Sequence, residues 1–167
     1  MIAQPLIVAL VLAFAVRSVA RLYAVPSMSM APALLPGDRI VVTRLVTDTP
    51  ARGDVIVFRH PIGGDLTVKR VIAIPGDLVD SDGGHVRIGG KALAEPYLAP
   101  GMTSDGIQAL VVPSQHLFVL GDNRIDSYDS RHWGPLPDDL IVGRARVILW
   151  HAGPDHGPES RIFKWIE

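Results

Sequence analysis

Two serines and a lysine are the residues of this sequence whose types and surroundings could support nucleophilic catalysis. Ser27 and Ser29 lie in the segment 26–32, which begins and ends with proline. Proline fixes the backbone angle φ, so the segment is stiff, as a loop that holds a nucleophile in one geometry should be. Lys69 lies at the centre of a β-branched run over residues 66–72, which is typical of a strand.

The sequence allows two environments for Lys69, a buried face of its strand or the solvent-exposed edge of a sheet. Strand alternation puts it on one face with Thr67, Val71 and Ala73, and puts Arg70 on the other with Val68 and Ile72. On a buried face the charged amine is disfavoured, so its pKa falls and the neutral amine can act as a general base. At a sheet edge the lysine would reach solvent and do no chemistry, and on spacing alone this interpretation is favoured.

Other catalytic and metal-binding chemistries find little support. The chain has no cysteine, which excludes thiolate catalysis, disulfides and thiolate metal sites. Its six histidines match no zinc-binding spacing, and the G-x-S-x-G motif of α/β-hydrolases is absent. Asp122, Asp126 and Asp129 are spaced somewhat like a calcium loop, but Arg124 occupies a ligand position and the loop glycine is missing. We therefore expect a salt-bridged turn there, no metal and no cofactor.

The charge distribution argues against nucleic acid as the main partner. The net charge is −1, and two of the 16 basic residues lie in residues 1–25, which contain no acid. The rest of the chain therefore has 14 basic and 17 acidic residues. Such a mildly acidic domain lacks the basic surface that phosphate backbones require.

The N-terminal segment predicts a membrane anchor. Residues 2–16 carry no charge, but at about 1.5 Å per residue they span only about 22 Å of a hydrocarbon core of about 30 Å. Extension through Arg17 and Arg21, four residues apart on one helical face, gives one membrane-spanning helix over about residues 2–24. A cleaved signal peptide would need a positive N-terminal region, which is missing, and a buried core helix would show an amphipathic stripe. The predicted organisation is an anchor over 1–25 and a domain over 26–167.

Beyond residue 26 the sequence predicts a mostly β domain, folded over as a barrel or sandwich. Clusters of Gly, Pro and Asp separate short β-branched apolar runs, and residues 86–93 are typical of a tight hairpin. The expected strands lie in residues 40–42, 55–58, 66–74, 117–120 and 141–150. Residues 152–160 are predicted to form a loop before a short apolar end at 162–166.

Four segments together resemble the type I signal peptidases, membrane-bound proteases with a serine nucleophile and a lysine base. The segments occur in the family's order at residues 26–38, 52–55, 69–77 and 121–131. With the predicted anchor, the resemblance covers nearly the whole chain. It implies a signal-peptidase-type β domain behind a single transmembrane helix, with a small second β subdomain around residues 80–112.

The resemblance implies a role for each matching residue. Ser29 would be the nucleophile and Lys69 its general base, with the Ser27 hydroxyl and the Ser29 backbone N–H forming the oxyanion hole. Ser127 would orient the lysine, and Met30 and Leu34 would help line the substrate pocket. The supporting residues would be Gly121, Asp122, Asn123 and Arg124 in one loop and the ion pair of Asp129 with Arg131. Departures from the family pattern occur at Met28, Ala33, Ile125 and Asp126, and none removes a catalytic group.

The resemblance also implies substrates and a location. Secretory preproteins would be cut after small-x-small sites such as Ala-x-Ala, without a cofactor. The catalytic domain would lie on the outer side of the bacterial cytoplasmic membrane, held by a single span in the lipid bilayer. The arginine count alone would instead put the domain in the cytoplasm. The oligomeric state has no signal in the sequence.

Three other functions compete with this interpretation. Self-cleaving repressors of the SOS type share the Ser and Lys chemistry, but they carry a DNA-binding motif and an Ala-Gly cleavage site that this chain lacks. A peptidase that matures conjugative pilin has the same segments in looser form. A membrane-anchored β domain without catalysis would be expected to have lost Ser29 or Lys69, and both are present.

Overall fold

Strands dominate the computed structural model, which describes residues 20–44, 49–152 and 161–166. The strands are β1 Ala20–Ala24, β2 Asp38–Thr43, β3 Val55–Arg59, β4 Leu66–Ala73, β5 Leu78–Asp82, β6 His85–Ile88, β7 Lys91–Ala92, β8 Leu110–Val111, β9 His116–Leu120, β10 Leu136–Pro137, β11 Ile141–His151 and β12 Lys164–Trp165. The helical turns are η1 Met28–Met30, α2 Ser130–Trp133 and η2 Asp138–Leu140. The fold is mostly β, as predicted from the turn-punctuated apolar runs.

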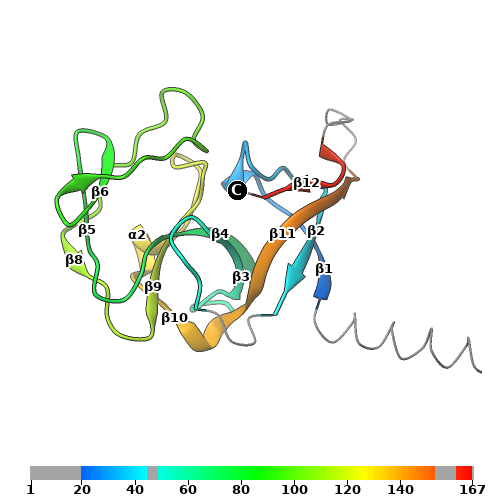
Figure 1. Ribbon diagram of the computed structural model, residues 1–167, viewed down its shortest axis with the longest axis horizontal. Coiled ribbons are helices and arrows are strands. Elements are labelled where there is room, and N and C mark those ends of the chain that lie inside the picture. Colours follow the sequence, from blue (N-terminus) through cyan, green and yellow to red (C-terminus); the bar gives the residue numbers. More distant parts are fainter. Residues whose placement is uncertain (1–19, 45–48, 153–160, 167) are drawn as a thin grey trace, which may run out of the picture.

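The strands form two antiparallel sheets (Figure 1). The larger sheet has the order β1-β2-β11-β3-β4-β9-β10, with β12 paired to β11, and it curls on itself. The smaller sheet has the order β7-β6-β5-β8. One apolar cluster contains residues of both sheets, including Ile72 and Phe118 of the larger and Val79 and Val86 of the smaller. The smaller sheet therefore packs against the β4 and β9 end of the larger one.

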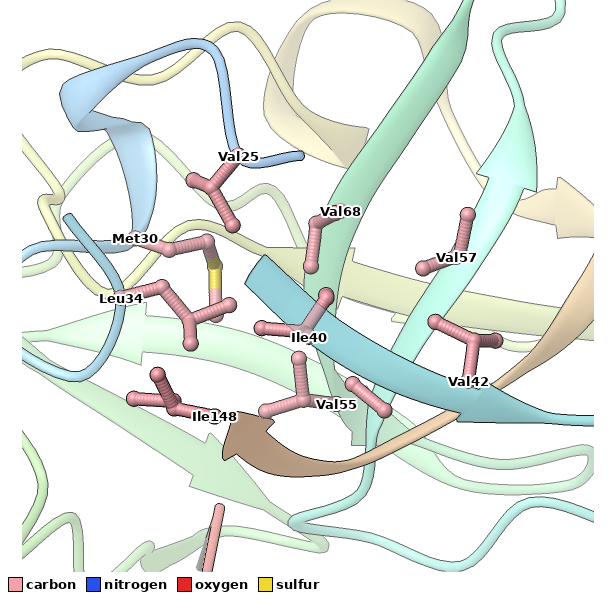
Figure 2. Packing of buried hydrophobic residues seen from close by; sticks show 10 residues of the cluster. Val25, Met30, Leu34, Ile40, Val42, Val55, Val57, Val68 and Ile148 are labelled. Carbon is pink, nitrogen blue, oxygen red and sulfur yellow. The ribbon is translucent and has the colours of Figure 1, made fainter. Parts of the chain in front are cut away.

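The residues around Ser29 are anchored in the core of the larger sheet. Met30 and Leu34 are fully buried in one cluster with Ile40 and Ile148, and Figure 2 shows this packing. Burial of such side chains contributes about 1.5–3 kcal/mol each. The serine loop is therefore fixed by apolar contacts on its inner side.

Strand β4 lies between β3 and β9, which explains why its two cations are buried. Lys69 is 3% exposed and Arg70 is fully buried, so the sheet-edge interpretation of Lys69 is wrong. The predicted alternation ends at an irregularity between Val71 and Ala73, where the pairing with β9 shifts. Ala73 consequently packs in the same cluster as Ile72 and not with Val71.

The end of the predicted transmembrane helix is wrong. Residues 20–24 form strand β1, which pairs with β2 from Ala20 opposite Thr43 to Ala24 opposite Arg39. The open edge of β2 gives these residues backbone partners that an apolar count does not reveal. Arg21 thus lies in a strand and cannot share a helical face with Arg17. Residues 2–19 lie outside the described residues, and among those described no helix is long and apolar enough to cross a membrane.

Candidate active site

Ser29 lies in η1, a single helical turn between two well-anchored ends. The Ala31 N–H donates to the Met28 carbonyl and the Leu34 N–H donates to the Met30 carbonyl, both at 2.9 Å. The prolines at 26 and 32 flank this turn, and the buried Met30 side chain holds it on the core. The backbone at Ser29 therefore has little freedom to move.

The Lys69 amine reaches Ser29 from the adjacent strand. Its Nζ lies 2.7 Å from Ser29 Oγ, although the two residues are 40 positions apart in the sequence. Burial lowers the pKa of Lys69 to about 8, against the opposing effect of the carboxylates of Asp129 and Asp122. A substantial fraction of the amine is therefore neutral at mildly alkaline pH and can accept a proton from the serine.

Ser27 lies on the exposed side of the same turn. Its Oγ is 3.2 Å from Ser29 Oγ. Asn123 holds the turn from the facing loop, where its backbone N–H donates to the Ser29 carbonyl at 3.1 Å. The Asn123 side-chain amide donates to the Met28 carbonyl at 3.3 Å. These bonds fix the position of the Ser29 backbone relative to the loop 121–131.

Gly121 allows that loop to approach the serine turn. A Cβ at this position would overlap the Ser29 carbonyl oxygen and Ser127 Oγ and would lie 2.6 Å from Ser127 Cβ. Only glycine fits at such a contact. The Ser127 hydroxyl is buried next to the Asp129 carboxylate and helps to lower the pKa of that group.

Asp129 organises the other end of the loop. Its carboxylate accepts from the Gly121 N–H at 3.1 Å and pairs with Arg131 at 2.8 Å, while also capping the N-terminus of α2. Burial acts to raise the pKa of Asp129, but the bonds from Arg131 and Gly121 hold that pKa below its usual value. A buried negative charge is thereby kept near Lys69.

Two buried arginines fasten the loop to the rest of the molecule. Arg70 donates to both carboxylate oxygens of Asp122, at 2.8 and 2.7 Å, and its guanidinium lies 3.9 Å from the centre of the Tyr97 ring. Arg124 donates to the Gly121 carbonyl at 2.9 Å and pairs with Glu95. The expected salt-bridged turn is thus present around Asp122 and Asp129, and among the described residues no cluster of potential metal ligands occurs.

Sequence reasoning missed the partners of these arginines. Glu95 and Tyr97 precede β8 in a long connection, and Ser104 of the same connection bonds Arg124. The buried Ser130 hydroxyl, also missed, accepts from the Val119 N–H at 3.0 Å. No local pattern in the sequence identifies these partners, because Ser104 and Glu95 lie 20 and 29 positions from Arg124.

A small cavity adjoins the serine turn. It has a volume of about 80 Å³ and is lined by Val25, Pro26, Ser27, Ser29, Met30, Leu66, Thr67 and Val68. Of the two predicted pocket residues, Met30 therefore lines the cavity. Leu34 does not line it and instead lies in the core cluster with Met30, because its side chain points inward from the following turn. The cavity can hold one small apolar group beside the Ser29 hydroxyl.

Comparisons with known proteins find relatives over most of this chain. Residues 1–150 match the model of the family described as signal peptidase, peptidase S26. The chain is 40% identical to signal peptidase I of Leptolyngbya laminosa over 152 residues, which cover 84% of this chain and 74% of that one. It is 37% identical over 158 residues to the probable signal peptidase I-2 of Synechocystis, covering 88% and 71%. A crystal structure of a signal peptidase I from Enterococcus faecalis has a TM-score of 0.50 and 32% identity, over 58% of this chain and 97% of that chain.

Proposed function

This chain belongs to the signal peptidase family, peptidase S26, and we propose that it removes N-terminal signal peptides from exported preproteins with Ser29 as nucleophile and Lys69 as general base. The observation that carries the proposal is the 2.7 Å contact between the Ser29 hydroxyl and a lysine amine that is 3% exposed. A solvated lysine would stay protonated at neutral pH and could not accept the serine proton.

The reaction uses one proton acceptor twice. Ser29 Oγ attacks the scissile carbonyl carbon while Lys69 Nζ takes the hydroxyl proton, which forms a tetrahedral intermediate. Collapse of the intermediate breaks the peptide C–N bond, and the proton passes from Lys69 to the leaving amine. Water then gives a proton to Lys69 and attacks the acyl ester, and release of the signal peptide returns that proton to Ser29.

The oxyanion that forms at the carbonyl needs hydrogen-bond donors. We assign this role to the Ser29 backbone N–H and the Ser27 hydroxyl. The Ser27 oxygen lies 3.2 Å from Ser29 Oγ, so a carbonyl attacked by Ser29 would come within its reach. The rigid turn keeps both donors in place before the substrate arrives.

Ser127 and the loop around it orient the lysine in this proposal. The Ser127 hydroxyl is buried where the loop 121–131 meets the serine turn, beside Gly121 and the Asp129 carboxylate, and from there it would bond the Lys69 amine. Asp122, Asn123, Arg124, Asp129 and Arg131 hold the loop in the arrangement given above. Substitution of these five residues would act on the geometry of Ser29 and Lys69.

Specificity for small residues follows from the cavity beside Ser29. A space of about 80 Å³ with a largely apolar lining suits a side chain such as alanine immediately before the cut. A larger side chain would require Met30 to move out of a core in which it is 1% exposed. We therefore propose cleavage after Ala-x-Ala sites.

We further propose that the enzyme acts at the bacterial cytoplasmic membrane, with its catalytic domain on the outer side. The uncharged residues 2–16 support an anchor in the bilayer. The described chain starts with β1, which ends at Ala24, three residues before Ser27. The cleavage site would therefore be close to the membrane, where the apolar part of a signal peptide lies.

The test uses the full chain purified in detergent with a secretory precursor. The wild type and Ser29→Ala, Lys69→Ala and Lys91→Ala variants are compared, and the new N-terminus is identified by mass spectrometry. Lys91 is an exposed lysine of β7 and serves as the matched control. We expect a cut after Ala-x-Ala that is lost in the first two variants and kept in the third.

Two results would contradict the proposal in different ways. Cleavage that survives Lys69→Ala would leave a serine peptidase with a different base. Failure of the wild type to cut secretory precursors would favour either the pilin-maturing specialisation or a non-catalytic anchored domain, and cleavage of a pilin precursor would decide between them.

A further inference from the structure

The segment that carries Ser29 is a loop closed at its base. The Val25 N–H donates to the Asp38 carbonyl, and the Gly37 N–H donates to the Val25 carbonyl, both at 2.9 Å. Residues 26–36 therefore leave the sheet and return to it at one point. Any group that fixes this base also fixes where the loop presents its hydroxyl.

A buried carboxylate occupies that base. Asp38 is fully buried, and its side chain accepts from the Leu35 N–H at 2.9 Å and bonds His151 Nδ1 at 2.9 Å. Burial acts to raise the pKa of Asp38, but the bonds from Arg161, Leu35 and His151 hold that pKa below its usual value. The carboxylate is thus ionised inside the protein and depends on a cation beside it.

Arg161 supplies the cation, from the far end of the sequence. Its guanidinium donates to Asp38 Oδ1 at 3.3 Å and pairs with Asp38 Oδ2. It also donates to the Pro32 carbonyl at 3.4 Å and the Ala33 carbonyl at 3.1 Å. One planar group, 7% exposed, therefore joins the base of the loop to its middle.

The path from these contacts to the nucleophile is short. Pro32 and Ala33 follow η1 after its C-cap residue Ala31, and the Leu34 N–H donates to the carbonyl of Met30, which is next to Ser29. The groups that set the pKa of Lys69 are its burial and the side chains of Asp129, Asp122, Arg131 and Asp126, and Arg161 is not among them. We therefore expect Arg161 to act through the position of Ser29 and not through the pKa of Lys69.

We propose that Arg161 is a positioning residue for the nucleophile. The inference rests on the proposed peptidase function. Lysine cannot replace Arg161, because a single ammonium group cannot span the Asp38 carboxylate and two carbonyls as a planar fork does. A positioning role differs from a purely structural one in its effect on kcat, because it predicts a lower kcat in a variant that is still folded.

The experiment measures kcat and KM for a soluble Ala-x-Ala peptide with the full chain in detergent. Arg161→Ala and Arg161→Lys are compared with the wild type and with Lys164→Gln, an exposed residue of the same C-terminal segment. Each protein is assayed at least 15 °C below its own midpoint of thermal unfolding. Added guanidinium ion, at millimolar concentration, serves as a probe for the space that the arginine side chain leaves.

We expect kcat to fall at least tenfold in both Arg161 variants, with KM changed less than threefold and the acidic limb of the pH profile at the wild-type pKa. Guanidinium should restore part of kcat in Arg161→Ala only, and Lys164→Gln should match the wild type. A kcat within twofold of wild type in either folded variant would overturn the inference. So would a result in which guanidinium ion raises the unfolding midpoint of Arg161→Ala without raising its kcat. A wild type that cuts no peptide would instead overturn the proposed function, and this inference with it.

Discussion

Lys69 and Arg70 are neighbouring buried basic residues, and they differ in whether a carboxylate pairs with them. Arg70 has a buried carboxylate partner in Asp122, 2.7 Å from its guanidinium. Lys69 forms no ion pair within 4 Å in the described part of the chain, and its nearest polar contact is the Ser29 hydroxyl. Burial removes water from around the Lys69 amine and no paired carboxylate compensates for it, so the population of the neutral amine rises.

The rate of peptide cleavage should therefore follow the protonation of Lys69. Burial lowers the pKa of Lys69 to about 8, so the amine is mostly protonated below that pH and cannot accept the serine proton. We expect kcat/KM to fall about tenfold for each pH unit below about 8. Steady-state assays between pH 5 and 10 check this, with unfolding followed in parallel. An activity maximum near pH 5 would exclude a neutral lysine as the base.

Replacement of Gly121 by alanine should inactivate the enzyme by displacement of Ser29. The added methyl group would overlap the Ser29 carbonyl oxygen and the Ser127 hydroxyl, and the first of these is backbone that cannot rotate away. We expect kcat/KM to fall at least 100-fold and the free energy of unfolding to fall by about 1–3 kcal/mol. Urea unfolding and peptide assays measure both.

Gly63→Ala is the matched control for this change. A Cβ at Gly63 would meet its nearest neighbour, an Asp65 carboxylate oxygen, at an ordinary 3.5 Å. It should leave activity and stability near wild type. Equal activity in Gly121→Ala and Gly63→Ala would show that the close approach of the two loops is dispensable.

At the scale of elements, the loop 121–131 is held in place by an ion pair with the segment that connects β7 and β8 of the smaller sheet. The Arg124 side chain is fully buried, Glu95 is 7% exposed, and the pair links the segment between β7 and β8 to the loop beside Ser29. Arg124 also holds the Gly121 carbonyl at 2.9 Å. The smaller sheet thus contributes to a site that none of its own strands enters.

Glu95→Gln should destabilise the protein strongly, because it removes the carboxylate that pairs directly with the buried Arg124 guanidinium. We expect the free energy of unfolding to fall by about 3 kcal/mol, with a loss of activity as the loop loosens. Asp82→Asn removes a partner of Arg87 that is 69% exposed, and it should change stability little. Urea unfolding of both variants measures the contrast. Similar behaviour of the two would mean that Glu95 and Arg124 are not coupled in solution.

The main strands could be predicted from the sequence. The two predictions that were wrong, the end of the N-terminal helix and the exposure of Lys69, have a common physical cause. The runs at 55–58 and 117–120 were predicted correctly as β3 and β9, because a continuous run of apolar residues within each segment marks a buried strand. The helix predicted to end near residue 24 failed because β1 exists only through its pairing with β2. The burial of Lys69 depends likewise on β3 and β9 on either side of it, which no local pattern encodes.

At the scale of the whole molecule, the two ends of the described chain converge on the loop 26–36, which carries Ser29. Strand β1 leads into Val25 at the base of this loop, and Arg161, just before β12, bonds Asp38 at the same base. Both strands belong to the half of the larger sheet built on β2 and β11. The segments that form the serine turn and the loop 121–131 could be recognised as motifs in the sequence, but this convergence could not, since Asp38 and Arg161 are 123 positions apart.

The convergence gives the proposed membrane anchor a fixed relation to the active site. Strand β1 is paired along its whole length, so a chain that enters at Ala20 is held at a constant distance from Ser29. A flexible Gly-Ser spacer of six residues placed before Ala20 would add a reach of roughly 12–15 Å. The active site could then leave the membrane surface without any change in its own geometry.

We therefore expect the spacer to slow cleavage of a membrane-engaged precursor several-fold more than cleavage of a soluble peptide. The comparison uses the full chain in liposomes that carry the precursor, and the same spacer between Gly89 and Gly90 of the β6–β7 turn is the control. Because that turn is exposed and lies in the smaller sheet, its variant should cut both substrates at nearly wild-type rates. Equal slowing of both substrates by the spacer before Ala20 would indicate damage to β1 and would contradict a role for membrane proximity.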